Sequence, residues 1–168
     1  GQGYYNTITP AVLQRNILEN PGWYTSYTPY QAEISQGRLE TLFTFQTVIC
    51  SLTSMPLANA SLLDEATACA EAMLMFYGSR SRAQQKGNVC RFFVSEDLFK
   101  QSIDVIKTRA LPRGIEVVVG NESTVLDETF FGAILQYPNC KGEIKDYAKF
   151  AADAKAKGIF VAVSADIM

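Results

Sequence analysis

The sequence predicts an α/β protein of three layers, in which a mostly parallel sheet lies between helices and follows a helical arm rich in aromatic residues. Two observations predict this class. From residue 57 onward, short apolar or β-branched runs alternate with helical patterns, which is typical of βαβ units. The runs are apolar without alternation, as in strands that are covered on both faces. We therefore expect the arm over residues 1–56 and the α/β part over residues 57–168.

The arm is expected to contain two helices joined by an aromatic loop. A short helix is predicted from Pro10 to Glu19 and a long one from about Ser35 to Ser54. The loop over residues 23–31 carries one tryptophan and three tyrosines. Because aromatic side chains of this kind are enriched where proteins meet, the loop is expected to contact another part of a protein.

Three main helices are expected in the α/β part. The helix over residues 64–77 carries one charge beyond its first turn, Glu71, so it is expected to be buried on nearly all sides. Ser95 is placed to cap the next helix, whose apolar residues follow the helical period. The third helix, residues 143–157, has an apolar stripe and is expected to expose three charged side chains, Lys145, Lys149 and Asp153.

The strands are the apolar runs that separate these helices. Their composition of β-branched and aromatic residues favours extended structure. They are expected at Val89–Val94, Ile115–Val119, Gly132–Tyr137 and Ile159–Val163.

The composition excludes several kinds of active site. The chain has no histidine, so a Ser-His-Asp system, a His-ligated zinc and an imidazole proton shuttle are excluded within it. The four cysteines are Cys50, Cys69, Cys90 and Cys140, and Cys50 and Cys69 are expected to be buried. They form no C-x-x-C pair, so no metal site is assigned. Widely spaced cysteines of this kind indicate a reducing compartment. With 15 basic and 17 acidic residues and no apolar stretch of membrane length, neither nucleic acid nor a membrane is an expected partner.

Four strings of residues are recognisable: GYYN at 3–6, NILENPGW at 16–23, YTPYQAEISQGRLE at 27–40 and ANASLLDE at 58–65. With them the chain resembles the N-terminal half of the P-protein family of the glycine cleavage system, the glycine dehydrogenases (decarboxylating). The resemblance runs along all 168 residues.

The resemblance implies an oxidoreductase of glycine catabolism that depends on pyridoxal phosphate. Such an enzyme releases CO2 from glycine and transfers the aminomethyl group to the lipoyl group of the H-protein. Its fold is the large-domain type of aspartate aminotransferase (fold type I), duplicated so that an N-terminal half without cofactor packs on a C-terminal catalytic half. This chain would be part of the first half, inactive alone, with the catalytic half and the lipoylated H-protein as partners. The implied location is the bacterial cytoplasm, or the mitochondrial matrix in a eukaryote.

The residues agree that the cofactor is bound elsewhere. The eight lysines are expected on helix exteriors and turns, where none could form a Schiff base beside a cofactor. The turn at residues 59–61 has the place of the cofactor-phosphate site of this fold, but Asp64 and Glu65 follow it and would repel a phosphate at the helix N-terminus. Asp166 lies where this fold has an aspartate beside the pyridine nitrogen of the cofactor. In a half that binds no cofactor, we expect it to be a carboxylate at the end of a strand or in a turn. No catalytic or cofactor-binding residue is therefore assigned.

The segment before the long helix is the expected substrate-binding segment. Its polar side chains suit glycine or its carboxylate. They are Tyr27, Thr28, Tyr30, Gln31, Glu33 and Ser35. Packing at an interface is an alternative interpretation of the same segment. Two other hypotheses for the chain stay open. One is a free-standing, non-catalytic subunit that binds a partner, and the other is a flavodoxin-like domain, which would need a Gly- or Ser-rich phosphate loop. Self-association is also expected, through the aromatic arm, the sheet edge or an exchanged segment.

Overall fold

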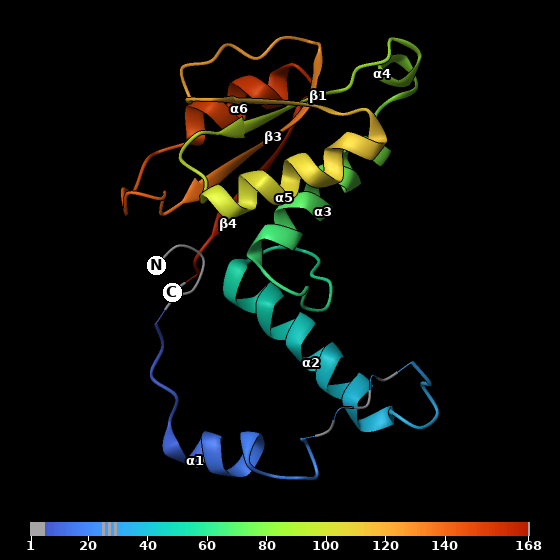
Figure 1. Ribbon diagram of the computed structural model, residues 1–168, viewed down its shortest axis with the longest axis vertical. Helices are drawn as coiled ribbons and strands as arrows, with labels where there is room; N and C mark the ends of the chain where they lie inside the picture. Colours follow the sequence, from blue (N-terminus) through green and yellow to red (C-terminus); the bar gives the residue numbers. More distant parts are fainter. Residues whose placement is uncertain (1–5, 25, 27, 29, 168) are drawn as a thin grey trace. The chain divides into compact units, whose positions relative to one another are not determined.

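The computed structural model describes residues 6–24, 26, 28 and 30–167. The chain divides into two compact units, a smaller one that ends at Ser61 and a larger one over Leu62–Asp166 (Figure 1). None of the described helices is long and apolar enough to cross a membrane.

The smaller unit contains three helical segments, α1 (Ala11–Leu13), the π-helical turn η1 (Gln14–Leu18) and α2 (Gln36–Thr53). The two helices predicted here are confirmed to within one residue at each end. Helix α2 ends because Ser54 adopts the left-handed conformation, with φ at 57°. None of the residues of these three segments is buried.

The larger unit is built on a parallel sheet, which confirms the predicted α/β class. The strands are β1 (Arg91–Ser95), β2 (Glu116–Gly120), β3 (Phe130–Tyr137) and β4 (Phe160–Ala165), in the order β2-β1-β3-β4. Every described neighbouring pair is parallel. Strands β1 and β3 are central and buried, whereas β2 and β4 lie at the edges, so the expectation that all four strands are covered on both faces was wrong for the edge strands.

Helices cover both faces of the sheet, as the three-layer prediction requires. Helix α3 (Glu65–Gly78) and helix α5 (Lys100–Ala110) pack side by side on one face, and α6 (Ala148–Ala156) packs on the other (Figure 1). Two short segments, α4 (Arg82–Lys86) and η2 (Leu111–Arg113), complete the unit.

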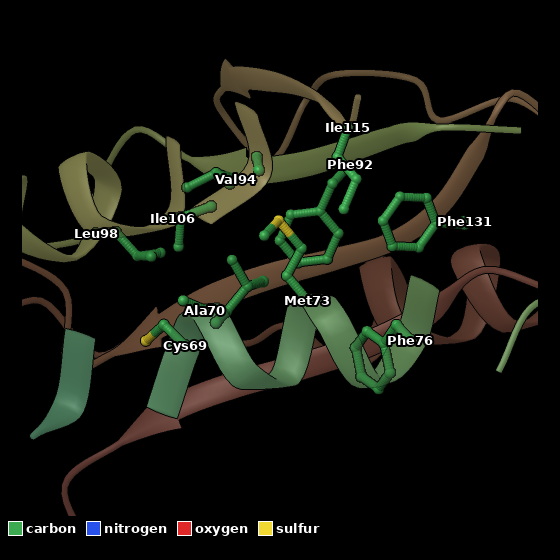
Figure 2. Close-up of a cluster of buried hydrophobic side chains, with 12 residues drawn as sticks. Cys69, Ala70, Met73, Phe76, Phe92, Val94, Leu98, Ile106, Ile115 and Phe131 are labelled. Atoms are coloured by element: carbon green, nitrogen blue, oxygen red, sulfur yellow. The ribbon is translucent and has the colours of Figure 1, made fainter. Parts of the chain in front are cut away.

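The strands divide their side chains between two cores. Phe92 and Val94 of β1 point to α3 and α5, whereas Phe93 between them packs on the α6 side. In Figure 2, Met73 of α3 lies against the phenyl rings of the sheet. Each of these four side chains is completely buried, and a fully buried apolar side chain of this size contributes about 1.5–3 kcal/mol to folding.

A bulge in β3 adds one aromatic ring to the α3 core. Arg91 pairs with Phe130 and the next residue of β1 pairs with Gly132, so Phe131 is an extra residue in the ladder. Its ring lies 5.4 Å from that of Phe92 and 5.3 Å from that of Tyr77. A Cβ atom at position 132 would lie 2.9 Å from a ring carbon of Phe76 on α3, so a larger residue at this strand position would have to displace that ring.

Three local expectations were wrong. Ser95 does not cap α5, which begins after Phe99; its Oγ accepts a hydrogen bond from the N–H of Asp97 instead. The last helix begins at residue 148 and not at 143, because the preceding residues form tertiary hydrogen bonds. Helix α3 is buried on one face and not all round, since Met75 is 62% exposed.

The cysteines of the chain are free thiols. Cys69 is buried, as expected, and burial raises the pKa of its thiol. Cys50 on α2 is only half-buried, so the expectation for it was wrong.

Candidate functional site

The predicted substrate-binding segment lies directly before α2. Tyr27 is outside the described residues, and the side chains of Thr28, Tyr30, Gln31 and Glu33 are exposed, Tyr30 at 88%. The N–H of Tyr30 donates to the carbonyl of Thr28 at 2.8 Å, and that of Ile34 donates to the carbonyl of Gln31 at 3.2 Å. The structure therefore presents these polar groups on consecutive turns at the surface of the smaller unit.

Ser35 is the exception in this segment because it is buried, at 5% exposure. It is the residue that precedes the first turn of α2, yet its side chain makes no capping hydrogen bond. Its Oγ atom has no hydrogen-bond partner in the described structure. A buried hydroxyl without a partner is rare and calls for a physical account.

A second group of polar residues lies at the carboxyl edge of the sheet. In the order β2-β1-β3-β4, the chain leaves β1 for β2 on one side and later returns to β3 on the other side of β1. Open α/β sheets bind ligands at the carboxyl ends of the strands where the strand order reverses like this. Asp97 follows β1 and Asn139 follows β3 at this point, and both are buried. The Nδ2 of Asn139 donates to Asp97 Oδ2 at 3.1 Å.

Lys145 places its ammonium group among these carboxylates. Its Nζ lies 2.7 Å from Asp97 Oδ2 and 2.6 Å from Glu122 Oε1, and Lys141 Nζ lies 3.1 Å from Asp97 Oδ1. These contacts hold the pKa values of Asp97 and Glu122 below their ordinary values and raise that of Lys145. The chain's own cation therefore occupies the edge where this fold binds ligands.

The position of Lys145 corrects the expectation that it faces solvent on the last helix. The helical period continues through residues 143–147, but the chain there is held by Asn139, whose Oδ1 accepts from the N–H of Glu143 at 2.8 Å. The sequence signal that was missed is the polar residue just beyond each central strand, Asp97 after β1 and Asn139 after β3. Lys149 and Asp153 are exposed as expected and pair with each other at 2.8 Å.

The N-terminus of α3 is occupied by carboxylates. Asp64 Oδ1 accepts from the N–H of Thr67 at 2.7 Å, and this bond lowers the pKa of Asp64. Glu65 Oε1 accepts from Gln136 Nε2 at 2.8 Å and from Ser164 Oγ at 2.7 Å. A phosphate placed here would meet two negative charges, so these residues do not fit pyridoxal phosphate.

Asp166 follows β4 directly, and its backbone N–H donates to the carbonyl of Tyr137 at 3.0 Å. Its amide thus continues the pairing of β4 with β3 beyond the strand end. Among the residues that the structure describes, no group of three or more Cys, Asp and Glu side chains could hold a metal ion.

Comparison with known proteins identifies relatives along the whole chain. The family described as "Glycine cleavage system P-protein" matches residues 1–168. Glycine dehydrogenase (decarboxylating) from Bacteroides fragilis is 56% identical over 169 residues, and that from Flavobacterium johnsoniae is 57% identical over 169 residues. Each match covers 100% of this chain and 18% of the relative. The chain thus spans less than a fifth of the length of these relatives.

A solved structure has the same fold. The crystal structure of glycine decarboxylase (P-protein) of the glycine cleavage system, in inhibitor-bound form, matches with a TM-score of 0.81 and 29% sequence identity. The match covers 99% of this chain and 38% of that chain. The similarity therefore includes both the sheet and the helices that precede it.

Proposed function

The chain belongs to the glycine cleavage system P-protein family, and on that basis we propose that it forms part of a glycine dehydrogenase (decarboxylating). In the complete enzyme, glycine loses CO2 and its aminomethyl group passes to the lipoyl group of the H-protein. The support is the match along residues 1–168 and the 56–57% identity with relatives that carry this name.

The proposed role of this chain is to supply the wall and the interface of an active site whose cofactor is bound by the C-terminal catalytic half. One observation carries this role: the carboxyl edge of the sheet is filled by Asp97, Glu122 and Lys145 and the α3 N-terminus by Asp64 and Glu65. The lysine at the carboxyl edge, Lys145, is paired with Asp97 and Glu122, and the carboxylates at the α3 N-terminus leave no cradle for the phosphate of pyridoxal phosphate. The isolated chain is therefore proposed to be inactive.

The polar segment over residues 27–35, of which Tyr27 lies outside the described residues, is the part of the chain proposed to face glycine. Its exposed donors and acceptors could reach a pocket of the catalytic half, and the exposed apolar residues of α2, such as Phe43 at 68%, support an interface with another part of the enzyme. The relatives compared above are bacterial, which supports the bacterial cytoplasm as the location.

A chimeric enzyme tests the activity. The segment of the Bacteroides fragilis enzyme that aligns with this chain is replaced by residues 1–168, and CO2 release from glycine is measured with lipoylated H-protein. We expect activity of the same order as that of the parent enzyme. A folded chimera that binds pyridoxal phosphate but releases no CO2 would contradict the proposal and favour a non-catalytic, partner-binding subunit.

The isolated chain tests the assignment of the cofactor. It is mixed with pyridoxal phosphate, reduced with borohydride and analysed by mass spectrometry. We expect no stoichiometric Schiff-base absorbance and no selective labelling of one lysine. Stoichiometric fixation on a single lysine, Lys145 included, would show that this chain holds the cofactor.

A further inference from the structure

A pocket lies in the larger unit between α6 and the connection from β2 to β3. Its volume is about 380 Å³, within the range of about 300–1,000 Å³ that ligand pockets have. One wall is the connection itself, at residues 122–126. The other wall is one face of α6 and its flanking residues, at the helical spacing 146, 149, 150, 153, 154 and 157.

Two lysine side chains hold the connection against α6 at the two ends of this wall. Lys145 Nζ lies 2.6 Å from Glu122 Oε1, and Lys157 Nζ donates to the carbonyl of Leu126 at 2.6 Å. The wall is therefore anchored at its first and its last residue. The space between these two contacts is a preformed feature of the fold.

The surface of the pocket is largely apolar and aromatic. Leu126 and Ala154 are buried, and the half-buried rings of Tyr147 and Phe150 line the pocket beside them. The hydroxyl of Tyr147 already donates to a backbone carbonyl of β3, at 3.2 Å. Val125 also lines the pocket but is 81% exposed, so its apolar side chain is left uncovered there. A bound ring would contact these groups and cover the valine.

The three carboxylates that line the pocket already have partners in the chain. Glu122 is paired with Lys145, and Asp153 Oδ2 lies 2.8 Å from Lys149 Nζ. Asp146 Oδ1 accepts from the first N–H group of α6 at 2.8 Å. A cationic ligand would therefore have to displace a partner that the chain itself supplies.

Lys157 differs from the other two lysines of the pocket. Within the described part of the chain its ammonium forms no ion pair, and its bond to the carbonyl of Leu126 uses one of three donors. It interacts electrostatically with Asp127 and Asp153 without pairing with either. An anionic group thus gains an ion pair at Lys157 and displaces none.

We propose that this pocket is a binding site for a small aromatic carboxylate. The ring lies against Tyr147, Phe150 and Val125, and the carboxylate pairs with Lys157. Because Lys157 is exposed, the buried ring contributes more of the affinity than the ion pair does. The inference does not depend on the proposed function, since it requires neither the cofactor nor the catalytic half.

An NMR titration of the chain over residues 1–168 tests the site with three probes that share one ring system: 2-naphthoate, 2-naphthamide and 2-naphthylmethylammonium. The ¹⁵N amides of Val125, Leu126 and Ala154 are expected to shift saturably with naphthoate. Naphthoate should bind about threefold more tightly than the neutral amide, and the ammonium compound more weakly than both. The proposal is overturned if these amides show no saturable shift, or if the ammonium compound binds as tightly as naphthoate.

Two variants test the two parts of the ligand separately. Lys157→Gln should weaken naphthoate about threefold to fivefold and leave naphthamide unchanged. Lys155→Gln is the matched control, because this lysine belongs to the last turn of α6 but does not line the pocket. Val125→Ser should weaken all three probes, with an unchanged urea midpoint because the side chain is exposed. Equal effects of Lys157→Gln and Lys155→Gln, equal losses of naphthoate and naphthamide in Lys157→Gln, or unchanged binding in Val125→Ser would overturn the proposal.

Discussion

Replacement of Asp97 by asparagine tests how much the ion pairs at the carboxyl edge contribute to stability. The substitution keeps the shape of a side chain that is 4% exposed and removes its charge. Asp97 Oδ2 accepts from Lys145 at 2.7 Å and from Asn139 at 3.1 Å, and Oδ1 pairs with the exposed Lys141. An asparagine amide must place an NH2 group against one of these donors.

The magnitude follows from the burial of the partners. A hydrogen bond to a charged group contributes about 1.5–3 kcal/mol, whereas the pair with Lys141 is largely screened by water. We therefore expect Asp97→Asn to lower the free energy of unfolding of the larger unit by about 2–3 kcal/mol at pH 7. The loss is smaller than for an uncompensated buried charge, because Lys145 is 30% exposed and can be hydrated.

The contribution of Asp97 should also depend on pH. The bond from Lys145 lowers the pKa of Asp97 in the folded chain. A carboxyl group with a lowered folded pKa contributes stability that is fully present above its unfolded pKa, about 3.9, and is lost as the pH falls through the folded value. The difference between the wild-type chain and Asp97→Asn should therefore narrow below about pH 4.

Urea unfolding followed by far-UV circular dichroism at pH 7 and at pH 3 measures both effects. Tryptophan fluorescence is unsuitable, because the single tryptophan, Trp23, lies in the smaller unit. Asp153→Asn is the control, since it breaks an exposed pair with Lys149 and should leave unfolding unchanged. The reasoning is refuted if Asp97→Asn behaves like this control at pH 7, or if its full effect persists at pH 3.

Three further outcomes are expected. Gly132→Ala should destabilise the larger unit by about 1–3 kcal/mol, because its Cβ would lie 2.9 Å from the ring of Phe76. Thermal unfolding measures this loss, and Gly78→Ala is the control, because a Cβ there would meet nothing within 4 Å. In the chimera, Tyr30→Ala should lower turnover and leave thermal stability unchanged; the opposite pattern would favour interface packing. The isolated chain should self-associate at micromolar concentrations through exposed apolar side chains such as Phe43, and light scattering from a monomer at every concentration would contradict this.

The sequence was sufficient for the elements whose signals are local. The four strands are unbroken apolar runs separated by helices, and this alternation alone predicts parallel pairing. The helix from Gln36 to Thr53 was predicted to within one residue at each end from apolar residues such as Leu39, Leu42 and Phe43. The strings at residues 27–40 and 58–65 were sufficient to indicate the family.

Ser35 shows the limit of this local information at the candidate site. The sequence predicted a polar segment before α2 but gave its six side chains the same weight. The structure distinguishes Ser35, which is buried without a partner, from the exposed side chains that precede it. Burial depends on which atoms surround a residue, and neither residue type nor spacing specifies this.

The tertiary structure alone decided what occupies the carboxyl edge of the sheet. The amphipathic pattern placed Lys145 on the outer face of a helix, but its ammonium binds Asp97, which lies 48 residues earlier, and the helix begins only at Ala148. The bulge at Phe131 was equally invisible, since it is set by the register against β1 and by the ring of Phe92. Helical period and strand composition act over a few residues along the chain, whereas ion pairs and packing depend on distances in space that are fixed only when the whole sheet has formed.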